Sequence, residues 1–236
     1  MVTSNIPLDE IEPRIRSRLT DPELVSKITI LAPDFRHPTD DRGHHELSSL
    51  DLHSKCTFAS FSLREAEGLE SDKLKSLEKA LKAATTFAEK PKGWLVLTGP
   101  YGCGKTHLAA AIANARTDLG DPPMFVMLPD LLDHLRAAFS PSSNTSYDRR
   151  FDEIRTAPLL ILDDLGTQSM TPWVREKLYQ LFNYRYNAEL PTVITSADTL
   201  DEMDARIRSR MLDTRLCTIY AITAPSYHGG KKRTKR

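Results

Sequence analysis

The stretch from Gly99 to Thr106, GPYGCGKT, constrains the fold more than any other part of the sequence. It fits the pattern G-x-x-x-x-G-K-[ST], in which glycines let the backbone turn tightly and point its N–H groups at phosphate oxygens. The apolar run 94–98 precedes this stretch, and an Ala-rich run that begins at Lys105 follows it. The motif therefore predicts a strand, a phosphate-binding loop and a helix whose N-terminus faces the phosphates.

Two side chains of this loop have expected roles beyond shape. We expect Lys105 to neutralise charge on the β- and γ-phosphates of ATP, and the Thr106 hydroxyl to bind Mg²⁺. The alternative is a glycine-rich turn beside an unrelated lysine, which would not require the flanking strand and helix. The residues predicted to contact the nucleotide are Gly99, Pro100, Tyr101, Gly102, Cys103, Gly104, Lys105 and Thr106.

A pair of carboxylates follows another apolar run. Residues 159–162, LLIL, predict a buried strand, and Asp163 and Asp164 come directly after it. Open α/β sheets bind their ligands at the carboxyl ends of strands. We therefore expect Asp163 to hold Mg²⁺ and Asp164 to orient or deprotonate the attacking water. A turn or N-cap pair of aspartates is the alternative, and it is stronger for Asp164 than for Asp163.

Short apolar runs alternate with helical patterns from residue 69 to residue 222. Such alternation is typical of a parallel sheet covered by helices on both faces. We predict an α/β fold with about five parallel strands, and we expect the strand that ends at Thr195 and Ser196 to neighbour the Asp163 strand. Predicted strands are 94–98, 124–127, 159–162, 192–195 and 216–222, and predicted helices are 69–89, from 105, 129–139, 147–155, 173–190 and 201–212.

The overall charge gives no argument for a nucleic acid or membrane partner, because 32 basic residues balance 32 acidic ones. The N-terminus lacks a basic and apolar targeting pattern, and no apolar run approaches the ~18 residues of a membrane span. We expect a cytoplasmic protein. Local candidates for DNA contact are Arg149, Arg150 and the basic tail 229–236, although a solvated loop and a solubility tail explain them equally well.

Residues 2–36 repeat residues 194–228 at a constant offset, with 15 identities in 35 pairs. Internal similarity of this kind indicates a duplicated module. Residues 1–36 are therefore predicted to be a partial copy of the C-terminal part of the main domain, either a relic or a donor of a strand and arginines to a neighbouring subunit. The polar segment 37–55 is predicted to be a linker, and residues 56–228 to be the ATPase domain.

Three arginines lie close together near the end of this domain. Arg206 and Arg210 are four residues apart on a predicted helix and share a face, whereas Arg208 does not. An arginine that reaches a neighbouring subunit's ATP would stabilise transition-state charge. Solvated surface arginines are the alternative.

The stretch from Cys56 to Tyr227 resembles the AAA+ ATPases of the DnaC/DnaI helicase-loader and IstB transposition-helper group, which are P-loop NTPases. The resemblance rests on CTFASF, WLVLTGPYGCGKTHLAAAIAN, LLILDDLG, NYRYNAELPTVITS and RIRSRMLD, in the family's order. It implies Walker A at 99–106, Walker B at 163–164 and a sensor position at Ala197. It also implies Arg210 as the arginine finger, with Arg206 as the second candidate, in a homo-oligomer whose subunits complete each other's sites.

The sequence departs from the family's pattern in four places. Ala197 replaces the asparagine of the usual Thr-Ser-Asn, and Ser226-Tyr227-His228 replaces an acidic-aromatic-Arg triplet. No helicase-binding or zinc domain is recognisable before residue 56, and only eight residues follow His228, so we expect no C-terminal helical lid.

The resemblance implies an Mg²⁺-dependent ATPase with one of two roles. The first is a DnaC-type helicase loader that assembles on single-stranded DNA, with a replicative helicase as partner. The second is an IstB-type transposition helper that engages a transposase on duplex DNA. A small-molecule P-loop kinase is a third reading, but such a kinase needs a substrate lid, which this sequence lacks.

Overall fold

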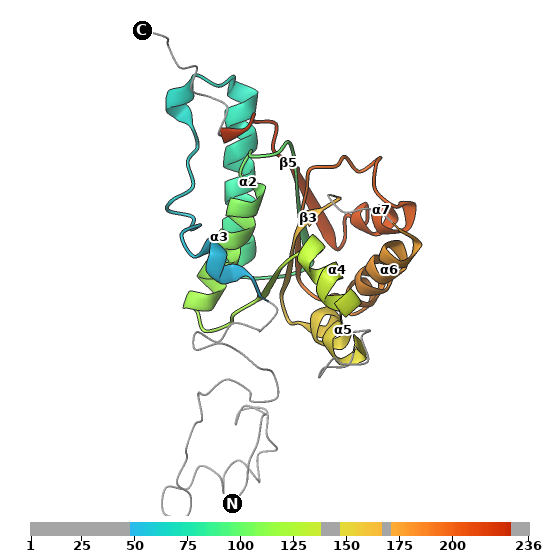
Figure 1. Cartoon of the computed structure of the whole chain (residues 1–236). Helices are drawn as coiled ribbons and strands as arrows, with labels where there is room; N and C mark the ends of the chain where they lie inside the picture. The colour runs from blue at the N-terminus through green and yellow to red at the C-terminus, as the bar shows by residue number, and fades with distance from the viewer. Residues whose placement is uncertain (1–47, 138–146, 167–170, 228–236) are drawn as a thin grey trace, which may run out of the picture. The chain divides into compact units, whose positions relative to one another are not determined.

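The computed structural model of the chain describes residues 48–137, 147–166 and 171–227, all within the unit 38–236 (Figure 1). Its strands are β1 Trp94–Thr98, β2 Met124–Met127, β3 Leu160–Leu165, β4 Thr192–Ser196 and β5 Cys217–Ala221. Its α-helices are α2 Ser71–Glu89, α3 Lys105–Asp118, α4 Leu128–Ala137, α5 Tyr147–Thr156, α6 Pro172–Asn187 and α7 Ala205–Met211. Two 3₁₀ turns, η2 Leu50–His53 and η3 Glu65–Glu67, precede α2.

The five strands form one parallel sheet in the order β2-β3-β4-β1-β5. The predicted α/β class and the five-stranded parallel sheet flanked by helices are confirmed. Strand β4 lies between β1, which leads into the glycine-rich loop, and β3, which carries the two aspartates. Because the strands are parallel, their carboxyl ends share one edge of the sheet, and the polar residues that end β4 lie between the loop and the aspartates.

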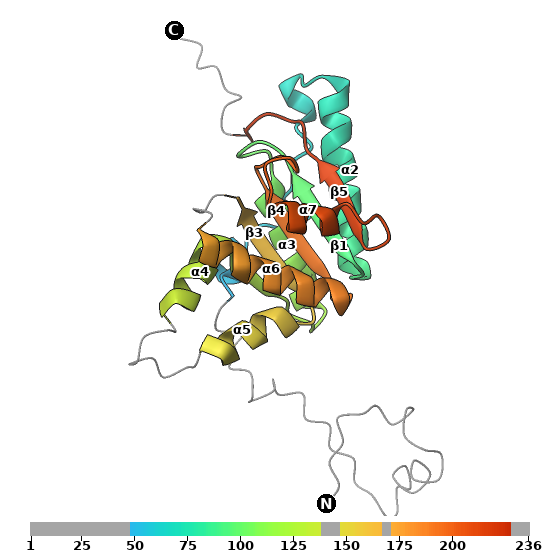
Figure 2. The same ribbon diagram turned by 90° about the vertical axis from the view of Figure 1, so that its right-hand side faces the viewer.

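Helices cover both faces of the sheet, and each face has its own apolar core. Helices α2 and α3 lie on one side of the sheet and α4 to α7 on the other (Figures 1 and 2). Trp94 and Phe182 belong to the core beneath α4 to α7, with ring centroids 5.6 Å apart, whereas Leu97 and Leu108 belong to the core beneath α2 and α3. Strands buried on both faces explain why their sequences are continuous apolar runs.

The predicted strand at 159–162 is longer in the structure, where β3 continues to Leu165. Hydroxyl groups at the end of β4 explain the extension: Thr195 Oγ1 accepts a hydrogen bond from the Asp164 N–H at 3.0 Å, and Ser196 Oγ donates one to the Leu165 carbonyl at 2.7 Å. The pairing register with β4 shifts between Leu162 and Leu165. The two aspartates are therefore part of an irregular strand end that β4 side chains hold in place.

The described part of the predicted linker, 48–55, packs against the domain. Leu50 is fully buried in the core beneath α2 and α3. The Ser49 N–H donates to the Phe125 carbonyl at 2.9 Å, and Asn114 Nδ2 donates to the His53 carbonyl at 3.0 Å. The packed domain therefore begins before Cys56. The polar composition of 37–55 hides this, because a single buried leucine and backbone hydrogen bonds make the contact.

Other sequence features lie outside the described residues. These are the partial repeat 1–36, the loop 140–146 and the basic tail 229–236. None of the helices in the described part of the chain is both long and apolar enough to cross a membrane.

Candidate phosphate-binding site

A cavity of about 500 Å³ lies over the loop between β1 and α3. The loop supplies about half of its lining residues, and the segment before α2, His107 of α3, Asp164 of β3 and Tyr227 supply the rest. The cavity is lined by Ser60, Phe61, Ser62, Arg64, Tyr101, Gly102, Cys103, Gly104, Lys105, Thr106, His107, Asp164 and Tyr227. It therefore combines the predicted phosphate-binding loop with one of the two predicted aspartates.

Two glycines of the loop adopt backbone conformations that other residues rarely adopt. Gly102 has φ 72° and Gly104 has φ 111°. A Cβ atom at Gly102 would lie 2.3 Å from Ser226 Oγ, and one at Gly104 would lie 2.9 Å from the Phe61 ring. Only glycine fits both the backbone angle and the space, so the loop needs both residues to keep its shape.

Lys105 is 5% exposed and lies at the start of α3. Its Nζ donates hydrogen bonds to the carbonyls of Gly99 at 2.8 Å and Pro100 at 2.9 Å, and it lies 5.7 Å from the centre of the Tyr101 ring. Within the described residues, Lys105 forms no ion pair with a carboxylate. The ammonium charge at the cavity wall is thus partnered by neutral carbonyl groups, and an anionic ligand would interact with it strongly.

Asp163 lies beneath the loop and is fully buried. Thr106 Oγ1 of α3 donates to its Oδ2 at 2.9 Å, and Thr195 Oγ1 of β4 donates to its Oδ1 at 2.6 Å. Burial raises the pKa of Asp163, and the two threonine hydrogen bonds oppose that rise. The carboxylate is therefore held by two neutral donors in a place where its negative charge is costly.

Asp164 is placed differently from its neighbour. It lines the cavity, and its φ of 61° lies in the left-handed region that non-glycine residues seldom occupy. The hydrogen bond from its N–H to Thr195 Oγ1 helps to fix that conformation. Thr195 therefore joins the two aspartates: it donates to the carboxylate of Asp163 and accepts from the backbone of Asp164.

The residues present fit a magnesium–nucleotide. A buried carboxylate and a hydroxyl, Asp163 and Thr106, are oxygen ligands of the kind Mg²⁺ prefers, and they already contact each other. The glycine loop, the Lys105 ammonium and the N-terminus of α3 together favour phosphate groups. The cavity volume lies in the range that holds small cofactors.

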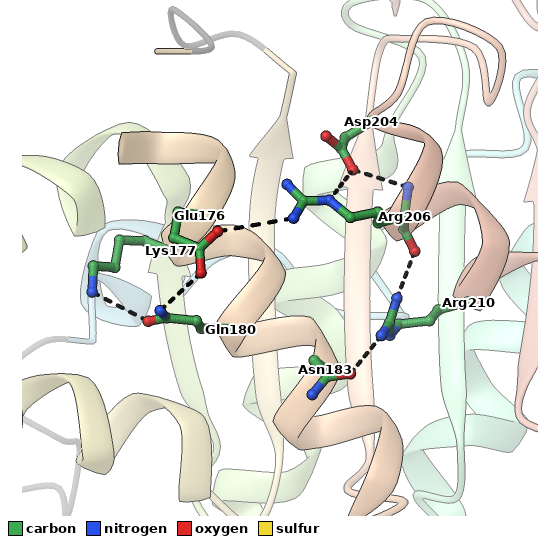
Figure 3. A network of polar contacts seen from close by, with 7 residues as sticks. All are labelled: Glu176, Lys177, Gln180, Asn183, Asp204, Arg206 and Arg210. Carbon is green, nitrogen blue, oxygen red and sulfur yellow. Dashed lines mark hydrogen bonds and ion pairs between the residues drawn. The ribbon is translucent and has the colours of Figure 1, made fainter. Parts of the chain in front are cut away.

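The two arginine candidates lie elsewhere in the domain, on α7 against α6 (Figure 3). The predicted shared face is observed: the guanidinium groups of Arg206 and Arg210 lie 4.4 Å and 4.9 Å from the centre of the Tyr179 ring. Arg206 also contacts Asp204 and Glu176, and Arg210 donates to Asn183 and to the Arg206 carbonyl. Neither is among the described residues that line the cavity of the same chain.

Six residues of the cavity wall were not predicted from the sequence to belong to the site. They are Ser60, Phe61, Ser62, Arg64, His107 and Tyr227. Arg64 is 5% exposed and donates to the Pro225 carbonyl, and its guanidinium lies 5.5 Å from the centre of the Tyr227 ring. The Tyr227 N–H donates to the Gly102 carbonyl at 2.9 Å, which joins the end of the domain to the loop. The segment CTFASF contains Phe61, and its aromatic residues in polar surroundings were the available signal.

Comparisons with known proteins agree with this geometry. The crystal structure of the DnaC helicase loader superposes with a TM-score of 0.59 at 22% identity, covering 73% of this chain and 99% of that one. The crystal structure of DnaI gives a TM-score of 0.58 at 27% identity, covering 74% and 92%. At 22% identity, the similarity to the DnaC structure shows the fold alone.

Curated relatives match over shorter stretches of their own length. The replicative helicase loader DnaI of Bacillus subtilis (strain 168) is 34% identical over 115 residues, which are 48% of this chain and 36% of that protein. The replicative helicase loader DnaC of Escherichia coli (strain K12) is 25% identical over 162 residues, which are 69% of this chain and 63% of that protein. This chain thus spans less than two thirds of either loader.

The family profile described as IstB-like ATP binding protein matches residues 30–233, most of the chain. The glycine loop, its lysine and the buried aspartate all lie within the matched range. The chain belongs to the family of IstB-like ATP-binding proteins, which is homologous to the DnaC and DnaI replicative helicase loaders and shares their AAA+ fold.

Proposed function

We propose that this protein is an Mg²⁺-dependent ATPase that acts as a helicase loader of the DnaC type and assembles on DNA. The observation that carries the ATPase part is the contact between Thr106 and Asp163, because it brings a hydroxyl and a buried carboxylate together beneath a phosphate-binding loop. The loader part rests on the homology to DnaI and DnaC.

The loop from Gly99 to Thr106 binds the triphosphate of ATP in this proposal. Lys105 exchanges its carbonyl partners for phosphate oxygens and neutralises their charge. Thr106 and Asp163 hold Mg²⁺, which would supply electrostatic stabilisation of the charge that develops on the phosphates. The domain that binds the nucleotide lies within residues 48–227.

Asp164 orients or deprotonates the attacking water in this proposal. It lines the cavity, and its backbone N–H is hydrogen-bonded to Thr195, which fixes the position from which its side chain extends. Ala197, at the family's sensor position, has no polar side chain. The hydroxyl of Thr195 contacts both aspartates and is the polar group of β4 that serves the site.

Arg210 and Arg206 complete the site of a neighbouring subunit in a homo-oligomer. Their place on α7, away from the cavity of their own chain, supports a role in trans. Arg206 is the more available of the two because its side chain is 47% exposed and its contact with Glu176 is long, at 3.9 Å. Arginines supplied in trans typically accelerate phosphoryl transfer by about 10³–10⁵-fold.

The proposal is tested by ATP hydrolysis and by DNA binding measured with fluorescence anisotropy, using a non-hydrolysable ATP analogue and single-stranded or duplex oligonucleotides at fixed salt. We expect nucleotide-dependent binding with a preference for single strands, and loss of both activities in Lys105→Ala. Arg149→Ala serves as a control variant for hydrolysis because Arg149 lies on α5, outside the cavity. Hydrolysis that survives Lys105→Ala would overturn the proposal.

A transposition helper of the IstB type is the second candidate, and the match to the IstB-like family profile favours it. The two candidates share the ATP site and differ in the DNA and protein that they engage. A preference for duplex DNA in the same anisotropy measurement, with recruitment of a transposase, would support this second role. Capture of a replicative helicase in the presence of ATP would support the first.

A further inference from the structure

Among the strands that the structure describes, β5 forms one edge of the sheet and pairs with β1 alone. The Trp94 N–H donates to the Leu216 carbonyl at 2.7 Å, and the Ile222 N–H donates to the Thr98 carbonyl at 2.8 Å. Parallel pairing alternates along a strand, so the even-numbered residues of β5 bond to β1. The N–H and C=O groups of Ile219 and Ala221 therefore point away from the sheet and offer an open backbone edge.

A groove of about 410 Å³ lies beside this edge, between β5 and α2. Helix α2 runs along β5 in both views of the molecule (Figures 1 and 2). Thr218 and Tyr220 of β5 line one side of the groove, and Ala83, Phe87 and neighbouring residues of α2 line the other. The groove thus has partly apolar walls next to unpaired backbone groups.

Four lysines surround the groove: Lys79, Lys82, Lys90 and Lys92. All four are exposed, and in the described part of the chain none of them forms an ion pair. Two other lysines of α2 do form ion pairs: Lys73 with Glu70 at 3.0 Å and Lys75 with Asp72 at 3.7 Å. Lys79 and Lys82 lie on α2 and Lys90 and Lys92 follow it, so the lysines without an ion pair gather at the groove.

We propose that the β5 edge and this groove bind an acidic, extended segment of a partner protein, which adds to the sheet as a sixth strand. The open groups of Ile219 and Ala221 require a polypeptide backbone as their partner. The lysines favour an anionic partner. A nucleic acid would satisfy the lysines but would leave the strand edge unpaired, so the two observations together favour a protein segment.

Strand geometry determines the order of residue types that we expect in the bound segment. Side chains of an added strand alternate between the two faces of the sheet, and one set lies on the face covered by α2, where the lysines are. Acidic residues at alternate positions would therefore meet Lys79, Lys82 and Lys90, and apolar residues between them would face the other side. The same lysines repel basic strands, which makes the edge selective.

The test uses the full chain and a fluorescent peptide of alternating Glu and Val, with a Lys-Val peptide and oligothymidine as competing probes. Anisotropy should show saturable binding of the Glu-Val peptide that weakens with added salt, and no binding of the Lys-Val peptide. Lys82→Glu with Lys90→Glu should weaken binding by about tenfold or more. Lys73→Glu with Lys75→Glu is the matched control on the same helix and should change the affinity little.

The backbone part of the proposal has its own test. Ala221→Pro removes an N–H that points away from β1, so the pairing with β1 remains while peptide addition is blocked. Ala221→Ser keeps that N–H and should bind normally. In the unmodified chain, hydrogen exchange at Ile219 and Ala221 should slow when the peptide binds, which supports the same contact without a substitution.

Three outcomes with the peptides would overturn the proposal. They are no binding of the acidic peptide, equal binding of both peptides, and peptide binding that is insensitive to Ala221→Pro with unprotected amides at the edge. Oligothymidine that binds more tightly than the peptide and loses affinity in the lysine variant would assign the groove to nucleic acid instead. ATP hydrolysis should stay unchanged in these variants, since none of their residues lines the nucleotide cavity.

Discussion

Two charged residues are fully buried near opposite ends of the same strands, and they differ in the number of their hydrogen-bond partners. Arg185, near the amino ends of β3 and β4, donates to the carbonyls of Arg155, Ala157 and Pro191 at 3.1, 2.8 and 2.6 Å, and to Thr192 Oγ1 at 2.9 Å. Asp163, near the carboxyl ends, is held by two threonine hydroxyls. The arginine has many partners within the fold, and the aspartate has few.

The difference separates a structural charge from a binding charge. Burial lowers the pKa of Arg185 to about 9, which still leaves it charged at neutral pH, and its hydrogen bonds join α5, α6 and the starts of two strands. Burial raises the pKa of Asp163, and no basic side chain forms an ion pair with it in the described residues. We infer that the cation for Asp163 is Mg²⁺, brought with the nucleotide.

Removing Arg185 should have the largest effect on stability. Arg185→Leu leaves the carbonyls of Ala157 and Pro191 buried without their donors, and we expect the free energy of unfolding to fall by roughly 3–5 kcal/mol. Urea denaturation measures this fall. Lys75→Leu is the control, because its ion pair with Asp72 is exposed on both sides and should contribute less than about 1 kcal/mol. Equal losses in the two variants would remove the structural role of Arg185.

Removing the charge of Asp163 should affect activity while sparing stability. We expect Asp163→Asn to reduce ATP hydrolysis by roughly 100-fold or more, because the metal loses its anionic ligand. The pKa of Asp163 is raised in the folded state, so ionisation of this group costs stability as pH rises through that pKa. The asparagine variant should therefore melt no lower than the unmodified protein at neutral pH without nucleotide. A markedly lower melting temperature would mean that Asp163 is also a structural charge.

Thr195 should contribute less to hydrolysis than Asp163, because it acts on the two aspartates through hydrogen bonds. Thr195→Val keeps the shape of the side chain and removes both hydrogen bonds to the aspartates, and we expect hydrolysis to fall by about tenfold. Thr195→Ser keeps the hydroxyl and should retain most of the activity. The values of kcat and KM, measured separately for the two variants, show whether the hydroxyl affects binding or a later step. Equal activity of valine and serine variants would exclude a positioning role.

The smallest expected effect is a dependence of the Mg²⁺ requirement on pH. Mg²⁺ binds the ionised form of Asp163, and a raised pKa means that protons compete with the metal at a higher pH than they would at an ordinary aspartate. As pH falls through that pKa, the Mg²⁺ concentration needed for half-maximal hydrolysis should rise. Measuring it at several pH values, with thermal melts to exclude unfolding, checks this. A requirement for Mg²⁺ that does not change with acid would argue against Asp163 as the ligand.

Most of the fold was predictable because its signals are local. The five apolar runs and the glycine loop give the strands and the phosphate-binding turn. Strands β1 and β2 have the predicted bounds, and the bounds of the other three lie within three residues of their predictions. The neighbourhood of β3 and β4 was also predicted, since polar residues at two strand ends indicate a shared edge. Helix α7 begins later than predicted, at Ala205, because the Asp204 side chain accepts a hydrogen bond from the Arg206 N–H and caps the helix there.

The parts that were not predicted depend on contacts between distant segments. Arg64 and Tyr227 are 163 positions apart in the chain and meet over the cavity, which no local pattern indicates. The hydrogen bonds of Thr195 with both aspartates depend on a shift in strand register. The environment of Arg185 depends on carbonyls from two distant segments, 155–157 and 191. Leu50 was assigned to a linker because its neighbours are polar, although its side chain is fully buried.

The most direct test of the account compares ATP binding with and without Mg²⁺ in the unmodified protein and in Asp163→Asn, by titration calorimetry. If Asp163 is the binding charge, Mg²⁺ should strengthen ATP binding in the unmodified protein by about tenfold or more and should have little effect in the variant. Binding of ATP without Mg²⁺ should be equal or tighter in the variant, because a negative charge near the phosphates is gone. An equal gain from Mg²⁺ in both proteins would contradict the account.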